Sequence, residues 1–214
     1  YTIPETSTGI ELDIVREALA FKDHTLIIHY MPLSRMPGSF ALGDVDGVMS
    51  DFGTDLSPLN GYYAEPAVLF NNRFYSLKNR NLRIREPRDI KGLSIIAFPG
   101  ARKRFPEWLN DPKTEGNYQE IKHQKLQILL LFSGRYDLVL SDKAVFQYFL
   151  SQQLENNNLL EKPLSEHDVF VERPLDYRPV FKSEKIRDDF NEGLQNLKDS
   201  GRYQEIYDFY LTDT

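Results

Sequence analysis

The sequence of 214 residues contains no cysteine, so disulfides, thiolate metal sites and cysteine nucleophiles are all excluded. It also lacks any apolar run close to the roughly 20 residues that a membrane-spanning helix requires, and we expect no such helix. No signal-peptide pattern is recognised in the sequence, and we expect that a mature secreted protein would have lost it.

Positive charge is also scarce. The chain carries 26 Lys and Arg residues against 32 Asp and Glu residues, and its net charge is −6. Nucleic-acid binding usually needs a basic surface, so we expect no nucleic-acid partner. The four histidines lack metal-ligand spacing, and no phosphate loop, nucleophile elbow or His-Glu metal motif is present. We therefore expect no metal and no cofactor.

The apolar periodicity alternates between helix and strand, which is typical of an α/β fold with parallel strands and crossover helices. A helix is predicted over 10–21 and a face of Ile186, Phe190, Leu194 and Leu197 predicts another, ended by Gly201. Strands are predicted at 25–30, 45–49, 67–77, 93–98, 118–122 and 136–140. Further helices are predicted at 102–109, 126–132, 143–154 and 203–211.

Two extended stretches, 67–77 and 169–181, bracket the central α/β unit. If the first unit and the C-terminal helices share one lobe, these stretches are the two crossings between lobes and form a hinge. We expect lobe one to comprise 1–75 plus 176–214, and lobe two to comprise 76–175. Each lobe should hold a mixed, mainly parallel sheet flanked by helices.

Short motifs follow one another in a fixed order along nearly the whole chain. They are GIELDI at 9–14, LGDVDG at 42–47, AEP at 64–66, DIKGL at 89–93, GRYDLVLSD at 134–142, FNEGL at 190–194 and SGRY at 200–203. Together they resemble the type II periplasmic solute-binding proteins of family 3, the polar amino-acid receptors of ABC transporters. The family opens with an apolar strand, and we expect this first strand to be absent here.

The resemblance implies a two-lobed periplasmic-binding-protein-like fold with two hinge strands. It implies that a periplasmic protein binds a small polar solute, such as an amino acid or related carboxylate, in the cleft between lobes. The protein would deliver the solute to the membrane subunits of an ABC transporter without acting as an enzyme. We expect it to be a monomer.

Four stretches that follow predicted strands are expected to reach the ligand, as parallel strands place such loops at one sheet edge. The ligand-binding candidates are Leu33, Arg35, Ser50, Asp51, Gly53, Thr54, Gly100, Ala101, Arg102, Ser141 and Asp142. The planar fork of Arg35 suits a carboxylate, the N–H groups after Gly100 suit an anion, and the resemblance implies that Asp142 accepts from a ligand ammonium.

Each candidate also has a structural interpretation. Arg35 and Arg102 could be solvated surface residues, Asp51 could bond its own backbone in a turn, and Asp142 could cap the helix that follows. The family's carboxylate-clamping arginine is missing, because Ser57 stands at its position.

Two other functions stay open. The same module could sense a ligand for a membrane signalling partner. It could also be a dehydratase-like enzyme that uses Glu11 or Asp51 as general acid or base.

Overall fold

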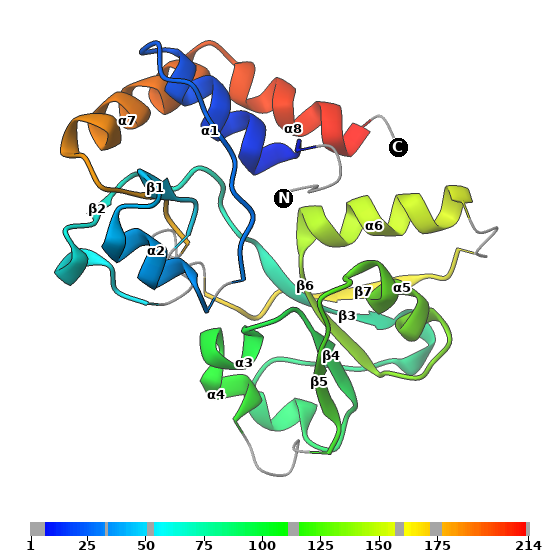
Figure 1. Cartoon of the computed structure of the whole chain (residues 1–214). Coiled ribbons are helices and arrows are strands. Elements are labelled where there is room, and N and C mark those ends of the chain that lie inside the picture. Colours follow the sequence, from blue (N-terminus) through cyan, green and yellow to red (C-terminus); the bar gives the residue numbers. More distant parts are fainter. Residues whose placement is uncertain are drawn as a thin grey trace. The chain divides into compact units, whose positions relative to one another are not determined.

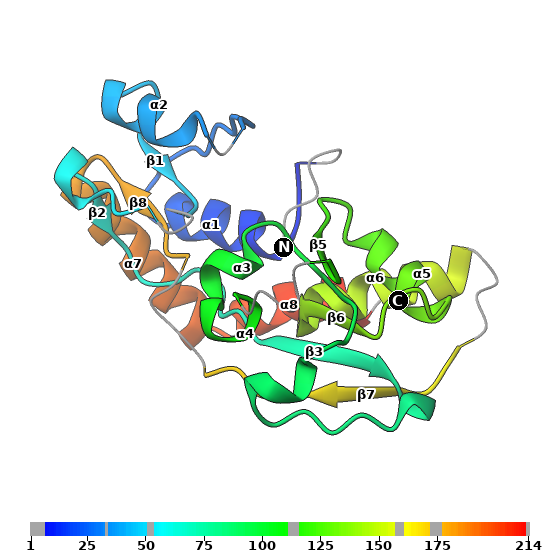
Figure 2. The same ribbon diagram turned by 90° about the horizontal axis from the view of Figure 1, so that it is seen from below.

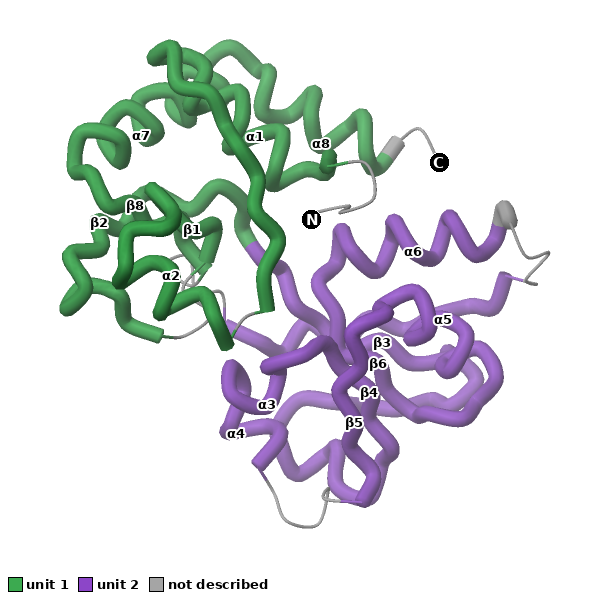
Figure 3. Tube along the Cα trace, viewed as in Figure 1, with its two compact units in different colours: residues 1–69, 173–213 green, residues 70–172, 214 purple. Residues whose placement is uncertain are grey.

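The computed structural model describes residues 7–32, 34–50, 54–110, 116–156, 161–171 and 177–212. Helices and strands alternate along these residues, which confirms the predicted α/β class (Figure 1). The chain divides into unit 1, residues 1–69 and 173–213, and unit 2, essentially residues 70–172 (Figure 3). No helix among the described residues is long and apolar enough to cross a membrane.

Unit 1 combines a small sheet with a group of helices. Its helices are α1 (Ile10–Ala20), α2 (Met36–Leu42), α7 (Glu184–Asp199) and α8 (Arg202–Thr212), with a 3-10 turn η1 (Ser57–Leu59). Its strands are β1 (Gly47–Val48), β2 (Tyr62–Tyr63) and β8 (Val180–Phe181), in the order β1-β8-β2. Both described pairs are antiparallel, unlike the mainly parallel sheet expected for this lobe.

Helix α1 packs against α7 and α8 (Figure 1). Leu12, Val15 and Leu19 recur at helical spacing on α1 and are buried. The approach to α7 is close at Gly193, where an added Cβ would lie 1.9 Å from the backbone oxygen of Ala18. The absence of a side chain at Gly193 therefore allows α1 and α7 to approach this closely.

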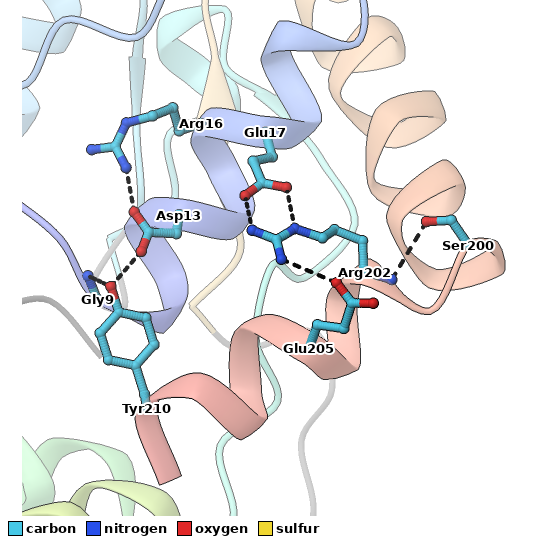
Figure 4. A network of polar contacts seen from close by, with 8 residues as sticks. All are labelled: Gly9, Asp13, Arg16, Glu17, Ser200, Arg202, Glu205 and Tyr210. Atoms are coloured by element: carbon cyan, nitrogen blue, oxygen red, sulfur yellow. Dashed lines mark hydrogen bonds and ion pairs between the residues drawn. The ribbon is translucent and has the colours of Figure 1, made fainter. Parts of the chain in front are cut away.

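Polar contacts also join α1 to α8 (Figure 4). The Arg202 guanidinium donates to both oxygens of Glu17, at 2.9 and 2.8 Å. The Tyr210 hydroxyl donates to Asp13 and accepts the Gly9 N–H at 2.9 Å. These contacts lie in partly exposed surroundings, so each adds at most about 1 kcal/mol.

Unit 2 is built on a five-stranded sheet in the order β5-β4-β6-β3-β7. The strands are β3 (Asn72–Leu77), β4 (Ile95–Ala97), β5 (Tyr118–Glu120), β6 (Leu138–Asp142) and β7 (Leu164–His167). Strand β4 pairs in parallel with β5 and β6, whereas β3 runs antiparallel to β6 and β7. The opposed arrows of β3 and β7 are seen in Figure 2. Its other elements are α3 (Ala101–Arg104), α4 (Pro106–Leu109), α5 (Lys125–Phe132), α6 (Lys143–Asn156), η2 (Lys78–Arg80) and η3 (Pro87–Ile90).

Side-chain alternation along these strands builds a core on each face of the sheet. Phe74 and Ile95 pack on one face with Trp108 of α4. Tyr75 and Ile96 pack on the other face with residues of α5 and α6. The sheet is thus a central layer with helices on both sides, as the sequence predicted for this part of the chain.

Several predicted elements need correction. The strand expected at 25–30 is wrong, because residues 24–32 are described and form no strand. Ile27 and Tyr30 are exposed there, and a β-prone run becomes a strand only when a neighbouring strand accepts its hydrogen bonds. The helix expected at 102–109 is two short helices separated at Phe105. The extended stretch at 67–77 becomes strand only from Asn72, inside the sheet of unit 2.

Candidate functional site

The candidates of unit 1 are only partly described. Leu33, Asp51 and Gly53 lie outside the described residues. Arg35 is exposed at the start of α2, where its backbone N–H donates to the Pro32 carbonyl at 2.9 Å. Ser50 is buried and Thr54 is exposed. The exposed Arg35 guanidinium remains the clearest charged candidate of this unit.

Asp142 ends strand β6 and has a defined structural task. Its carboxylate accepts the Asn71 N–H at 2.7 Å and the Val145 N–H at 3.1 Å. Val145 lies in the first turn of α6, so Asp142 caps this helix, and it is 4% exposed. The cap interpretation therefore describes what Asp142 does here, and its role toward a ligand stays a prediction.

Ser141 places its hydroxyl on the same face of the sheet as Tyr75. Strands β6 and β3 are neighbours, with Ser141 opposite Arg73 and Tyr75 two residues along. Both hydroxyl oxygens are buried, and neither is hydrogen-bonded to another described residue. Burial, followed by the charge of Glu166, raises the pKa of Tyr75, so its hydroxyl stays protonated. The two hydroxyls are polar groups with spare hydrogen-bonding capacity beside Asp142.

The third stretch follows β4, and its N–H groups already have partners. Gly100, in the left-handed region at φ +86°, donates to Oε2 of Glu120 at 2.7 Å. Ala101 donates to the Phe98 carbonyl at 3.2 Å, and Arg102 donates to Oε1 of Glu120 at 3.0 Å. A carboxylate of the protein thus occupies donors that the sequence assigned to a ligand anion.

Glu120 was not among the sequence candidates. It ends β5, opposite Ala97 of the parallel neighbour β4, which brings it to the same sheet edge as Gly100. The Tyr118 hydroxyl also donates to it, at 2.6 Å. Burial alone would raise the pKa of Glu120, but hydrogen bonds from Tyr118, Arg102 and Gly100 outweigh it and lower the pKa. The carboxylate is therefore ionised at neutral pH.

Arg104 is a second residue that sequence analysis missed. It is 8% exposed, and its guanidinium lies 5.5 Å from the centre of the Phe70 ring and 5.4 Å from that of Phe105. It lines a small cavity of about 10 Å³ together with Phe70, Asn71, Asn72, Phe105, Phe170 and Val171. Such a volume holds about one water molecule, so this cavity is too small for a solute.

A larger hollow lies at the other end of the parallel strands. Its volume is about 310 Å³, and it is lined by Ser94, Gly116, Asn117, Tyr118, Gln119, Arg135 and Tyr136. Ser94 and Asn117 precede β4 and β5, so this hollow is at the amino ends of the strands, away from the candidate residues.

Two sets of described side chains are candidates for a catalytic role, Glu11 on α1 and the pair Ser76 and His167. Burial raises the pKa of Glu11, on α1, from 4.5 to about 7, which is near the range useful for proton transfer. The pair formed by Ser76 and His167, at 2.9 Å, is buried in the sheet, and burial lowers the pKa of His167. Among the described residues no group of three His, Asp or Glu could hold a metal ion.

Comparison with known proteins relates the chain to binding proteins, although no family model matches it. The arginine-binding periplasmic protein of Mannheimia haemolytica is 21% identical over 204 residues, 95% of this chain and 81% of that protein. An amino acid ABC transporter substrate-binding protein of Streptococcus pneumoniae, solved with L-arginine, has a TM-score of 0.68 at 18% identity and covers 96% of this chain and 84% of its own.

A histidine kinase sensor domain with similarity to periplasmic binding proteins has a TM-score of 0.67 at 16% identity, over 95% of this chain and 86% of its own. The fold is therefore that of the two-lobed periplasmic binding proteins, as the order of sequence motifs predicted.

Proposed function

We propose that this chain is a periplasmic solute-binding protein that binds a small polar molecule and delivers it to the membrane subunits of an ABC transporter. The observation that carries the proposal is the shared fold, which extends over 96% of the chain in the likeness to the amino acid ABC transporter protein. The relatives are named for arginine or amino acids, so amino acids and related carboxylates are the first ligands to test.

The proposal assigns the binding task to the predicted residues of both units. Arg35 is the strongest member in unit 1, because it is exposed and carries a planar, permanently charged fork. In unit 2 the assigned residues are the loop from Gly100 to Arg102 and the step from Ser141 to Asp142. No catalytic role is assigned to any of them.

A thermal-shift screen against amino acids, small carboxylates, polyamines and short peptides tests the proposal. A ligand that binds only the folded chain raises its melting temperature by mass action, by an amount set by the ratio of ligand concentration to Kd. Calorimetry then measures the affinity of each hit, and NMR of the mixture shows whether the hit is converted. A hit that is bound and recovered unchanged supports a receptor, and failure of all four classes contradicts the proposal.

A second candidate is a sensory module for a membrane signalling protein, favoured by the likeness to the histidine kinase sensor domain. Both candidates bind a solute and differ in the partner. The genes beside the coding gene distinguish them, because a receptor is expected beside transporter subunits and a sensor beside a signalling protein. Conversion of a hit would instead favour an enzyme, with Glu11 as the group to substitute first.

A further inference from the structure

We propose that Glu120 determines which solute charge unit 2 accepts, by holding with its own carboxylate the N–H donors that would otherwise receive a carboxylate of the solute. Unit 2 then selects for a solute with positive charge, and against one that offers a carboxylate at this position. This inference rests on the proposed function, because it names the ligand class of a binding protein.

The first support is geometric. The carboxylate of Glu120 accepts from Gly100 N at 2.7 Å, Arg102 N at 3.0 Å and Tyr118 Oη at 2.6 Å. The three donors come from two segments 16 to 18 residues apart in sequence, so the arrangement is set by the pairing of β4 with β5. The N–H of Ala101, between Gly100 and Arg102, donates to the Phe98 carbonyl. A carboxylate fits this place, and the chain supplies it.

The second support is charge. A solute carboxylate brought to this loop would meet an ionised carboxylate, because the hydrogen bonds hold the pKa of Glu120 below its usual range. Like charges a few ångströms apart repel, whereas an ammonium or guanidinium would be attracted. A carboxylate has about four acceptor positions and the described donors use three, so Glu120 can still accept from a cationic solute.

Arg102 is the cation closest to this place in sequence, and its positive charge adds to the hydrogen bonds in lowering the pKa of Glu120. Its guanidinium lies 5.0 Å from the centre of the Tyr118 ring. Among the described contacts no ion pair joins Arg102 and Glu120, which meet through the backbone N–H of Arg102. Glu120 is therefore an ionised carboxylate on a half-buried side chain.

The first experiment follows the amide NMR signals of Gly100 and Arg102 in the full chain during titration with acetate. We expect saturable shifts of both signals in Glu120→Ala, which frees the two donors, and none in the wild type. Glu120→Gln keeps the size of the side chain and controls for collapse of the loop. Equal responses in wild type and Glu120→Ala overturn the inference, and so does the absence of a response in Glu120→Ala when its spectrum is otherwise native.

The second experiment compares L-arginine with agmatine, which is the same molecule without its α-carboxylate. By calorimetry we expect the wild type to bind agmatine at least about tenfold more tightly than L-arginine, since one charged contact changes sign. Glu120→Gln should lose this preference, whereas Tyr118→Phe, which removes a donor but keeps the charge, should retain it. A merely structural role for Glu120 would alter the melting temperature and leave the preference unchanged.

The two experiments separate the two proposals. A wild type that prefers L-arginine, or a preference unchanged in Glu120→Gln, contradicts charge selection by Glu120 while supporting solute binding. A wild type that binds neither compound, with the expected acetate response in Glu120→Ala, supports the occupied-donor geometry and contradicts the proposed function for this ligand class.

Discussion

The contact between α1 and α7 gives a sharp prediction for Gly193→Ala. A Cβ at this position would lie 1.9 Å from the Ala18 oxygen, and ordinary van der Waals contact begins near 3.4 Å, so the helices would have to separate by about 1.5 Å. Alanine favours the helical backbone by about 1 kcal/mol, but overpacking costs about 1–3 kcal/mol or more. Because the obstacle is backbone rather than a flexible side chain, we expect a net loss of about 2 kcal/mol or more in the free energy of unfolding.

Gly38→Ala is the matched control. Gly38 lies within α2, and apart from its own helix backbone no atom of the described residues lies within 4 Å of its added Cβ, so this substitution should stabilise by up to about 1 kcal/mol. Urea unfolding followed by far-UV circular dichroism measures both variants. The only tryptophan, Trp108, lies in unit 2, so its fluorescence reports that unit while circular dichroism reports both. If Gly193→Ala is as stable as the wild type, the close approach of α1 and α7 is wrong.

Three further predictions follow. Asp142→Ala should lower the free energy of unfolding by about 1–2 kcal/mol, because it leaves two backbone N–H groups without their acceptor; an unchanged urea midpoint would contradict the cap. Arg35→Ala should weaken solute binding in calorimetry without lowering the melting temperature, and Arg83→Ala, also an exposed arginine, should do neither. Burial raises the pKa of Glu11 from 4.5 to about 7, so the folded chain favours its protonated form. Stability should therefore fall as pH rises through this window, and Glu11→Gln should be more stable than the wild type at pH 8 by up to about 3 kcal/mol, with little difference below pH 4; parallel pH profiles would refute this.

Regular periodicity made some elements easy to predict. Phe190, Leu194 and Leu197 are buried on one face of α7, because a single apolar stripe at a period of 3.6 residues has few other ways to leave water. The strand at 164–167 could not be read in the same way, since Ser165, Glu166 and His167 are polar. It forms because the edge of β3 offers it hydrogen-bond partners. Strand formation depends on a neighbour that the local sequence does not contain.

The candidate site shows the same division. Gly100 after β4 and the cap at Asp142 are local features, and the sequence pointed to both residues, although β6 runs on to Asp142 where the prediction ended the strand at Leu140. The role of Glu120 depends on the register that sets it opposite Ala97, which no local pattern reveals. The predicted strand extended over 118–122 and placed Glu120 in its middle, whereas β5 ends at Glu120 and brings its side chain to the sheet edge.

The division of unit 1 into two separate stretches of sequence has a consequence for the order in which the protein can fold. A ribosome completes all of unit 2 before it reaches α7 and α8, the helices against which α1 packs. Domains generally fold as they emerge, and contacts distant in sequence form late. The Arg202–Glu17 contact spans 185 residues, so α1 and α8 can meet only when the chain is nearly complete. The packing of α1 against α7 is likewise completed late in synthesis, so unit 1 is expected to finish folding after unit 2.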